Sequence, residues 1–209
     1  MVFISFSGID GAGKKTHSEI LAKHFKYLGF VNVNVLSFPE YNSVSGRLIK
    51  DIIRSKNIDH LLMQCLQVAN RAEIIPKYLY NDDCNQQNII TIADRYIPCA
   101  FAYSVAAGIS ENEIYSLNKN FPIPDISILL NISVEESFLR RPKRRDEYEN
   151  NEKLLQNVSR EYIRFFNNPP KFYSHKKCTI IDGIGSKDEI NLKVVNAIND
   201  VKEKVFNKS

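Results

Sequence analysis

Cysteine is scarce in this sequence, and the few cysteines that occur are isolated from one another. Cys65, Cys84, Cys99 and Cys178 form no CxxC pair and no His/Cys cluster, so neither a disulfide scaffold nor a structural zinc site is expected. No stretch approaches the ~20 apolar residues that a membrane-spanning helix needs. The N-terminal MVFISFSG also lacks the basic region of a signal peptide. We therefore expect a soluble, cytoplasmic protein without a membrane partner.

A strong excess of charge is also missing. The 28 Lys and Arg residues stand against 24 Asp and Glu residues, which leaves a formal net charge of +4. This small net charge does not favour a nucleic-acid partner.

The composition is that of an ordinary globular protein. The chain has 209 residues, of which 44% are hydrophobic and 25% charged, close to the roughly 45–50% and 25% of globular proteins. Because we find no repeat, low-complexity tract or linker, we expect one domain over residues 1–209.

Five short apolar runs rich in β-branched residues alternate with longer amphipathic segments. The runs predict strands at Val2–Phe6, Val33–Ser37, Ile89–Ala93, Ile126–Ile132 and Thr179–Ile181. The segments predict helices at Ser18–Leu28, Gly46–Arg54, Leu61–Leu79, Glu135–Arg140, Asn150–Phe166 and Lys187–Phe206. Strands that alternate with helices form βαβ units, so the pattern predicts a three-layer α/β/α fold around a five-stranded parallel sheet.

A glycine-rich segment, GIDGAGKKT at residues 8–16, joins the first expected strand to the first expected helix. Its G-x-x-x-x-G-K spacing is typical of a loop that binds a nucleoside triphosphate. In such a loop the backbone amides and the helix N-terminus surround the phosphates, and the lysine reaches the β- and γ-phosphates. The alternative is a tight turn without a ligand. The spacing and the position between a strand and a helix favour the phosphate loop.

The residue after Lys14 departs from this motif. The usual Ser or Thr, whose hydroxyl binds magnesium, is replaced by Lys15. Thr16 follows one residue too late and would point about 100° around the helix. Magnesium keeps several of its waters and needs few protein ligands, so phosphate oxygens, water and a carboxylate such as Asp10 or Asp94 would serve.

Further motifs follow the expected strands, where the loops of open α/β sheets form a ligand crevice. They are FPEY at 38–41, ANR at 69–71, DRY at 94–96 with CAFAYS at 99–104, PD at 124–125 and RRDEYE at 144–149. Together with GIDGAGK, and in this order, they resemble the thymidylate kinases over nearly the whole chain. The resemblance implies a P-loop fold with a helical lid near residues 140–149. It also implies transfer of the γ-phosphoryl group of ATP to dTMP for dTTP biosynthesis, with Mg²⁺ as cofactor, by a homodimer.

The resemblance also implies a role for each matched residue. ATP would be bound by Gly8, Gly11, Ala12, Gly13, Lys14, Lys15 and Thr16. The acceptor dTMP would be bound by Asp10, Phe38, Tyr41, Gln67, Arg71, Arg95, Tyr103 and Tyr148. Catalysis would depend on Lys14, Asp10, Asp94 and Arg95, and on one or more of the lid residues Arg140, Arg144 and Arg145. The metal would be bound through Asp10 or Asp94.

Within the acceptor site, Tyr41 and Arg95 would hold the phosphate, because the planar guanidinium can bind two oxygens at once. Arg71 would hydrogen-bond the thymine edge, and Tyr103 would pack under the deoxyribose, where a 2′-hydroxyl would clash. Each residue also has an ordinary structural alternative: a salt bridge between Asp94 and Arg95, a surface charge at Arg71 and a core aromatic at Tyr103.

Gln67 departs from the family pattern, which has a phenylalanine that stacks on thymine at this place. Base–aromatic stacking contributes roughly 1–3 kcal/mol per base, so its loss would weaken base binding unless Phe38, Phe101 or Tyr103 compensates. A hydrogen bond from Gln67 to the base edge is the other possibility, and it leaves a different pyrimidine open. The alternatives are therefore a P-loop kinase for another pyrimidine deoxynucleotide or nucleoside, or a nucleotide sensor without turnover.

Overall fold

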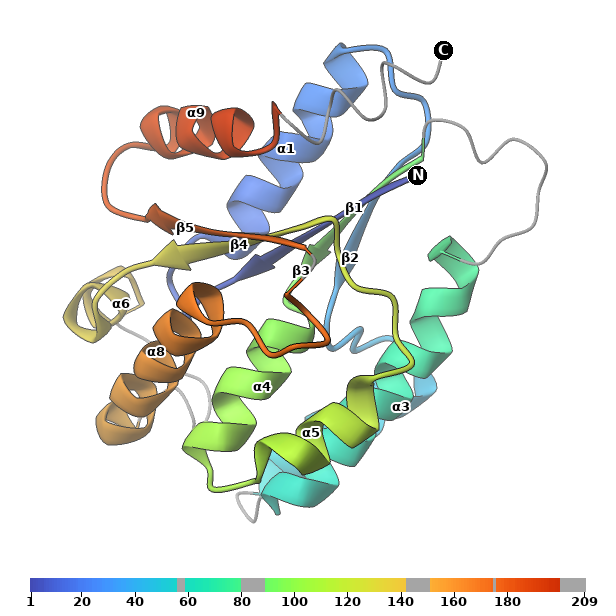
Figure 1. Cartoon of the computed structure of the whole chain (residues 1–209), viewed down its shortest axis with the longest axis vertical. Helices are drawn as coiled ribbons and strands as arrows, with labels where there is room; N and C mark the ends of the chain where they lie inside the picture. The colour runs from blue at the N-terminus through green and yellow to red at the C-terminus, as the bar shows by residue number, and fades with distance from the viewer. Residues whose placement is uncertain (56–58, 80–88, 142–150, 175, 200–209) are drawn as a thin grey trace.

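The computed structural model describes residues 1–55, 59–79, 89–141, 151–174 and 176–199. These residues form a five-stranded parallel sheet in the order β2-β3-β1-β4-β5 (Figure 1). The strands are β1 (Val2–Ser7), β2 (Val33–Ser37), β3 (Ile90–Asp94), β4 (Ile126–Asn131) and β5 (Lys177–Asp182). All five predicted strands are confirmed, with small shifts at their ends.

The three central strands are buried along almost their whole length. β1 has no exposed residue, and β3 and β4 are buried except for their last residues. Because both faces of these strands are covered, their sequences are continuous apolar runs rather than alternating ones. Three polar groups in this core form a chain, since Ser5 Oγ lies 2.8 Å from Ser127 Oγ and Ser127 Oγ lies 2.7 Å from the Tyr173 hydroxyl. The burial of both faces of these strands agrees with helices on either side of the sheet, so the predicted three-layer α/β/α fold is confirmed.

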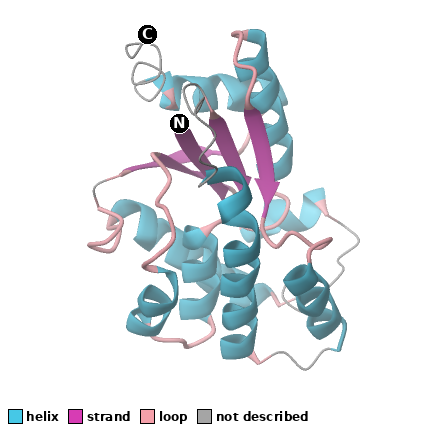
Figure 2. Ribbon diagram, turned by 90° about the vertical axis from the view of Figure 1, so that its right-hand side faces the viewer, coloured by secondary structure: helices cyan, strands magenta, loops and turns pink. Residues whose placement is uncertain are grey.

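Helices cover both faces of the sheet (Figure 1). One face carries α1 (Lys14–Tyr27) and α9 (Lys187–Ala197). The other carries α4 (Ile97–Ala106) and α8 (Glu152–Asn167), with α3 (His60–Leu79) and α5 (Glu111–Asn118) beside α4. α2 (Val44–Ser55) packs on α3, and α6 (Val134–Arg140) follows β4. Figure 2 shows the strand arrowheads pointing toward a group of helices that extends beyond the sheet, so the carboxyl ends of the strands are surrounded by helices.

The structure adds two helices that the sequence did not predict, α4 and α5. Seven of the ten residues of α4 are buried, so the helix has no polar stripe from which a period of 3.6 residues could be recognised. α5 is short, but Ser110 and Glu113 form a capping box at its start, with the Ser110 N–H donating to Glu113 Oε2 at 3.1 Å. That S-x-x-E pattern was the available indication of a helix start.

Two predicted segments extend beyond the described residues. The helix predicted over Lys187–Phe206 is confirmed over Lys187–Ala197, and residues 200–206 lie outside the described part. Most of the predicted lid, residues 142–149, is also outside it; α6 ends at Arg140. Among the helices that the structure describes, none combines the length and hydropathy that crossing a bilayer would require.

Candidate active site

The phosphate loop connects β1 to α1, as predicted. Gly13 caps α1 with φ 91°, a left-handed conformation that glycine adopts without strain. No described side chain hydrogen-bonds to the first-turn amides of α1, and none of residues 14–17 is acidic. The N-terminal amides and the helix dipole are therefore available to an anion. Lys15 points away from this end, with a side chain 78% exposed and 4.0 Å from Glu19.

Lys14 is buried beside the loop. Its side chain is 6% exposed, and its Nζ donates to the Ile9 carbonyl at 2.9 Å and lies 3.8 Å from Asp10 Oδ1. Burial lowers the pKa of Lys14 and Arg95 lowers it further, while Asp10 and Asp94 oppose the change. A buried ammonium whose charged form is disfavoured gains most from a new anionic partner. A phosphate held by the loop amides would be such a partner.

Asp10 is surrounded by cations at the carboxyl ends of β1 and β3. Arg95 Nη2 donates to Asp10 Oδ1, and Arg141 Nη1 lies 3.3 Å from the same oxygen. Burial raises the pKa of Asp10, but Arg95, Lys14 and Arg141 outweigh it and hold the pKa below its ordinary value. One carboxylate thus faces three cations, so the cluster keeps an excess of positive charge. That excess suits an anionic group.

Arg95 is held in place by its backbone as well. It has φ 69°, which is uncommon for a residue other than glycine, and its N–H donates to the Phe6 carbonyl at 2.9 Å. Such a conformation persists where the surroundings determine it, and it is concentrated at functional sites. The Arg95 guanidinium also lies 6.0 Å from the centre of the Tyr103 ring. The salt bridge considered between Asp94 and Arg95 is not the observed pairing, because Arg95 binds Asp10.

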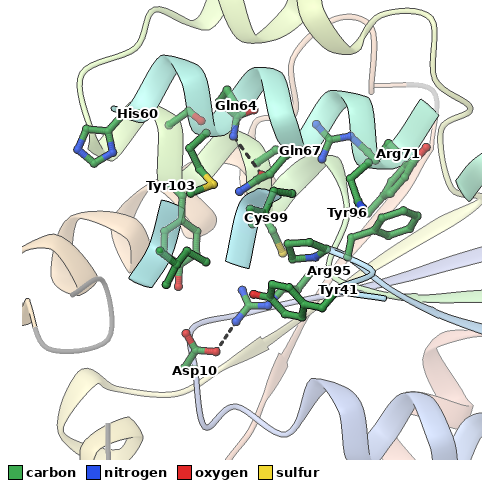
Figure 3. A pocket seen from close by; sticks show the side chains of 18 of the residues that line it. Asp10, Tyr41, His60, Gln64, Gln67, Arg71, Arg95, Tyr96, Cys99 and Tyr103 are labelled. Carbon is green, nitrogen blue, oxygen red and sulfur yellow. Dashed lines mark hydrogen bonds and ion pairs between the residues drawn. The ribbon is translucent and has the colours of Figure 1, made fainter. Parts of the chain in front are cut away.

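A cavity of about 320 Å³ extends from this cluster to α3 (Figure 3). Asp10, Arg95 and Arg141 line one end, together with Tyr41 from the loop after β2. α3 lines the opposite side with Gln64, Gln67 and Arg71. Between them lie aromatic and small side chains, namely Phe38, Tyr96, Cys99, Ala100, Tyr103 and Ser104. The cavity thus has a cationic end, a mixed aromatic wall and a polar side on α3 to which Asn70 also contributes, so that this side carries one arginine and three amides.

Arg71 is buried rather than a surface charge, so that alternative is wrong. It is 2% exposed, and its Nη2 donates to Asn118 Oδ1 at 2.7 Å. Burial lowers the pKa of Arg71 to about 10, so the guanidinium stays charged at neutral pH. Its buried Nε finds no hydrogen-bond acceptor in the part of the chain that the structure describes.

A family model described as thymidylate kinase matches residues 6–190. The chain belongs to the thymidylate kinase family. Members of this family are ATP-dependent nucleoside monophosphate kinases, and the cationic cavity next to a phosphate loop agrees with that chemistry.

Similar proteins extend over nearly the whole chain. The "Probable thymidylate kinase" of Sulfolobus acidocaldarius is 34% identical over 192 residues, 91% of this chain and 92% of that protein. The "Thymidylate kinase" of Wolbachia pipientis is 29% identical over 197 residues, 90% of this chain and 94% of that protein. The solved thymidylate kinase of Candida albicans superimposes with a TM-score of 0.77 at 22% identity, covering 96% and 92% of the two chains, which shows a shared fold.

The structure brings together most of the acceptor residues that the sequence indicated. Those that line the cavity are Asp10, Phe38, Tyr41, Gln67, Arg71, Arg95 and Tyr103. Tyr148, Arg144 and Arg145 lie outside the described residues. Arg140 contacts the phosphate loop, since its Nη1 donates to the Gly11 carbonyl at 3.3 Å and its Nη2 to the Gly183 carbonyl at 2.9 Å.

Sequence reasoning missed three polar residues of this thymidylate kinase site. Arg141 lies within the range expected for the lid, but its contact with Asp10 was not predicted. Gln64 lies one helical turn before Gln67, and this i, i+3 spacing was the available indication. Asn70 is part of the ANR motif, but the sequence assigned no role to it. Its role is recognised only from its hydrogen bonds in the structure.

Asn70 joins the loop that carries Tyr41 to the helix that carries Arg71. Its Oδ1 accepts from the Glu40 N–H at 2.8 Å, and its Nδ2 donates to Ser43 Oγ at 2.8 Å and Ser45 Oγ at 3.0 Å. Gly46 of α2 approaches the same loop so closely that a Cβ on Gly46 would lie 1.8 Å from the Glu40 carbonyl oxygen. The loop is therefore packed against α2 and hydrogen-bonded to α3.

We expect Asn70→Ala to destabilise the protein by about 1–3 kcal/mol, because the Glu40 N–H loses its acceptor and the Ser43 and Ser45 hydroxyls each lose one of their partners. The KM for the phosphate acceptor should rise as well, since the loop with Tyr41 loses its attachment. Urea unfolding and steady-state kinetics measure the two effects. The same change at Asn112, exposed on α5, is the control. Equal stability of both variants would contradict a structural role for Asn70.

Asp94 is the carboxylate that best fits a metal. Its Oδ1 is buried and has no hydrogen-bond partner among the described residues, whereas Asp10 is already bound to cations. Within the same residues, no cluster of three or more His, Cys, Asp or Glu side chains is present. A magnesium ion would thus have to bring most of its ligands with it, as it does when nucleotide phosphates and water supply them.

Proposed function

We propose that this chain transfers the γ-phosphoryl group of ATP to dTMP, which yields dTDP and ADP for dTTP biosynthesis. The observation that carries this proposal is the shared carboxylate of Asp10. On one side it lies 3.8 Å from the phosphate-loop Lys14, and on the other it binds Arg95 and Arg141 at the cationic end of the cavity. A donor phosphate on the loop and an acceptor phosphate at Arg95 would therefore be neighbours. The family membership supports the same reaction.

Phosphoryl transfer has a loose transition state with charge spread over the equatorial oxygens, so positioning and neutralisation supply most of the catalysis. On the donor side, Lys14 and the loop amides would hold the β- and γ-phosphates. On the acceptor side, Arg95, Arg141 and Tyr41 would orient the monophosphate. That phosphate already ionises at low pH, so no general base is required. Arg140, next to the Gly11 carbonyl, and the lid arginines Arg144 and Arg145 would neutralise the group in transit.

Asp94 would hold a magnesium ion carried by the ATP phosphates, directly or through a water. When bound, such an ion supplies positive charge that neutralises the β- and γ-phosphate oxygens. The buried Asp94 Oδ1, which has no hydrogen-bond partner among the residues that the structure describes, and the proximity of Asp94 to Lys14 support this assignment. Asp10 keeps Arg95 and Arg141 in position instead.

An ADP-release assay with ATP, Mg²⁺ and a panel of acceptors tests the proposal. We expect the highest kcat/KM with dTMP, when dUMP, dCMP, dGMP and thymidine are compared. A clear preference for thymidine or for another monophosphate would replace dTMP as the acceptor. Tight binding of both ATP and dTMP without ADP release would identify a nucleotide sensor.

We also propose that the protein is a homodimer. Leu48 on α2 and Leu61 and Leu62 on α3 are about half exposed, at 52%, 47% and 47%, and exposed apolar groups on adjacent helices favour association. Sedimentation equilibrium measures the mass directly, and a single-chain mass of 24.0 kDa at micromolar concentration would contradict the dimer.

Three expectations from the sequence stay predictions. They are one kinase domain over residues 1–209, a lid over residues 140–149 and a cytoplasmic location.

A further inference from the structure

The backbone of the phosphate loop is held by side chains that bind its carbonyl groups. Four successive carbonyls of the loop each accept a hydrogen bond from a side chain. The pairs are Gly8 with Tyr162 (3.4 Å), Ile9 with Lys14 (2.9 Å), Asp10 with Ser137 (2.6 Å) and Gly11 with Arg140 (3.3 Å). The bond from the Ser137 hydroxyl to the Asp10 carbonyl is the shortest of the four.

α6 packs directly on the loop at this point. Its Ser137 is buried, with 3% of its surface exposed. A Cβ added to Gly11 would lie 3.2 Å from the Ser137 carbonyl oxygen and 3.4 Å from the Ser137 Cα, so little room separates the helix from the loop. Arg141, the residue after α6, lies 3.3 Å from the Asp10 carboxylate. The same segment therefore contacts both the backbone and the side chain of Asp10.

The peptide between Asp10 and Gly11 needs a contact that fixes its direction. Gly11 has φ 82°, and glycine adopts negative φ values about as readily. The peptide is trans, so its C=O and its N–H point to opposite sides. Because the Ser137 hydroxyl binds the Asp10 carbonyl, the Gly11 N–H points away from α6. That N–H finds no acceptor among the residues that the structure describes.

We propose that Ser137 is a positioning residue of the donor site, which fixes the Asp10–Gly11 peptide so that the Gly11 N–H donates to a phosphate of ATP. An inverted peptide would direct the Asp10 carbonyl oxygen at the phosphate and repel it, whereas the fixed peptide supplies a preorganised donor. The Ser137 hydroxyl bonds the loop backbone, so its effect on the nucleotide passes through this peptide. The inference rests on the proposed function, because it takes the phosphate loop as the ATP site.

Ser137→Ala tests the inference. Alanine removes the hydroxyl and suits a helix, since it is the best helix former. The matched control is Ser127→Ala, which removes a buried hydroxyl that bonds Ser5 and Tyr173 in the core. Ser127 lies near the amino end of β4, at the opposite end of the strand from the site. The measurements are kcat/KM for ATP, KM for dTMP and the Kd for ATP by calorimetry, with urea unfolding of each protein.

We expect Ser137→Ala to lower kcat/KM for ATP by roughly 5- to 50-fold and to raise the Kd for ATP by a similar factor, because the misplaced amide loses its alignment with the phosphate. The KM for dTMP should stay unchanged, since the Asp10 carboxylate keeps its contacts with Arg95 and Arg141. Ser127→Ala should destabilise the protein and leave the constants for both nucleotides unchanged.

Two results would overturn the inference. One is a set of ATP constants within about twofold of the wild type in Ser137→Ala, less than the loss of one hydrogen bond would cause. The other is an equal loss for ATP and dTMP, which would indicate a general structural role. If the wild type binds ATP but does not phosphorylate dTMP, the proposed function fails and the Kd for ATP still decides the inference. Should the alanine variant fail to fold, Ser137→Cys carries the same test, because a thiol is only a weak donor.

Discussion

Arg95→Ala is expected to lower kcat/KM for dTMP by roughly thirtyfold to several thousandfold, since truncating one member of a buried charge pair costs about 2–5 kcal/mol. Two effects combine in this variant. The acceptor phosphate loses its principal cation, and Asp10 loses one of the three cations that compensate its charge. The less compensated carboxylate then repels the incoming phosphate. ADP-release kinetics with varied dTMP measure the loss, most of which we expect in KM.

Two further variants show whether this loss comes from the cavity. Arg164→Ala removes a guanidinium that pairs with Glu111 and Glu161 on partly exposed helix surfaces, each at 2.7 Å, and should leave turnover unchanged. Asp10→Asn combined with Arg95→Ala should recover part of the activity, because the repelling charge is gone. Arg95→Ala with kcat/KM within fivefold of the wild type would show that the acceptor phosphate binds elsewhere.

Lys14→Met is expected to lower kcat by roughly 10²–10³-fold, the usual effect of removing one preorganised group that stabilises transition-state charge. The stability of the free protein should not fall. Burial lowers the pKa of Lys14, so the ammonium is unfavourable where it stands, and methionine fills the same volume without a charge. Kinetics and thermal unfolding of the same preparations measure both effects. A large loss of stability with normal turnover would reverse the assignment and make Lys14 a structural residue.

The pH dependence of stability provides a separate test of the buried ammonium. The folded protein disfavours protonated Lys14, whereas the unfolded chain keeps the ordinary pKa of 10.5. Between the two pKa values the unfolded state binds more protons, so the free energy of unfolding rises with pH across that window. The penalty is fully present below the lowered pKa and is relieved as the pH rises. The difference between wild type and Lys14→Met in urea unfolding should therefore shrink with rising pH. A constant difference would contradict a disfavoured ammonium.

Local patterns predicted most of the fold. The strands were recognisable because burial on both faces demands continuous apolar runs, as in β1 and β4. The amphipathic helix α2 was recognisable because one face is buried and the other exposed. α4 escaped prediction for the opposite reason, since it is covered on nearly all sides. The order of the strands could not be predicted, because strand pairing depends on contacts between segments that are distant in sequence.

The same division applies to the site. Residues 8–16 contain the complete phosphate loop, so the donor side follows from nine adjacent residues and the conformational freedom of glycine. The acceptor side is assembled from pairs that are distant in sequence. Asp10 and Arg95 are 85 residues apart, and Arg71 and Asn118 are 47 residues apart.

The sequence alone thus determined that this protein has a phosphate loop on a parallel sheet, because the backbone geometry and the amides of such a loop are local properties. Only the tertiary structure decided which cations surround Asp10, which amides pair on α3 and which buried donors and acceptors stay unpaired. These features depend on burial and on distances between separate elements, and both exist only once the chain has packed.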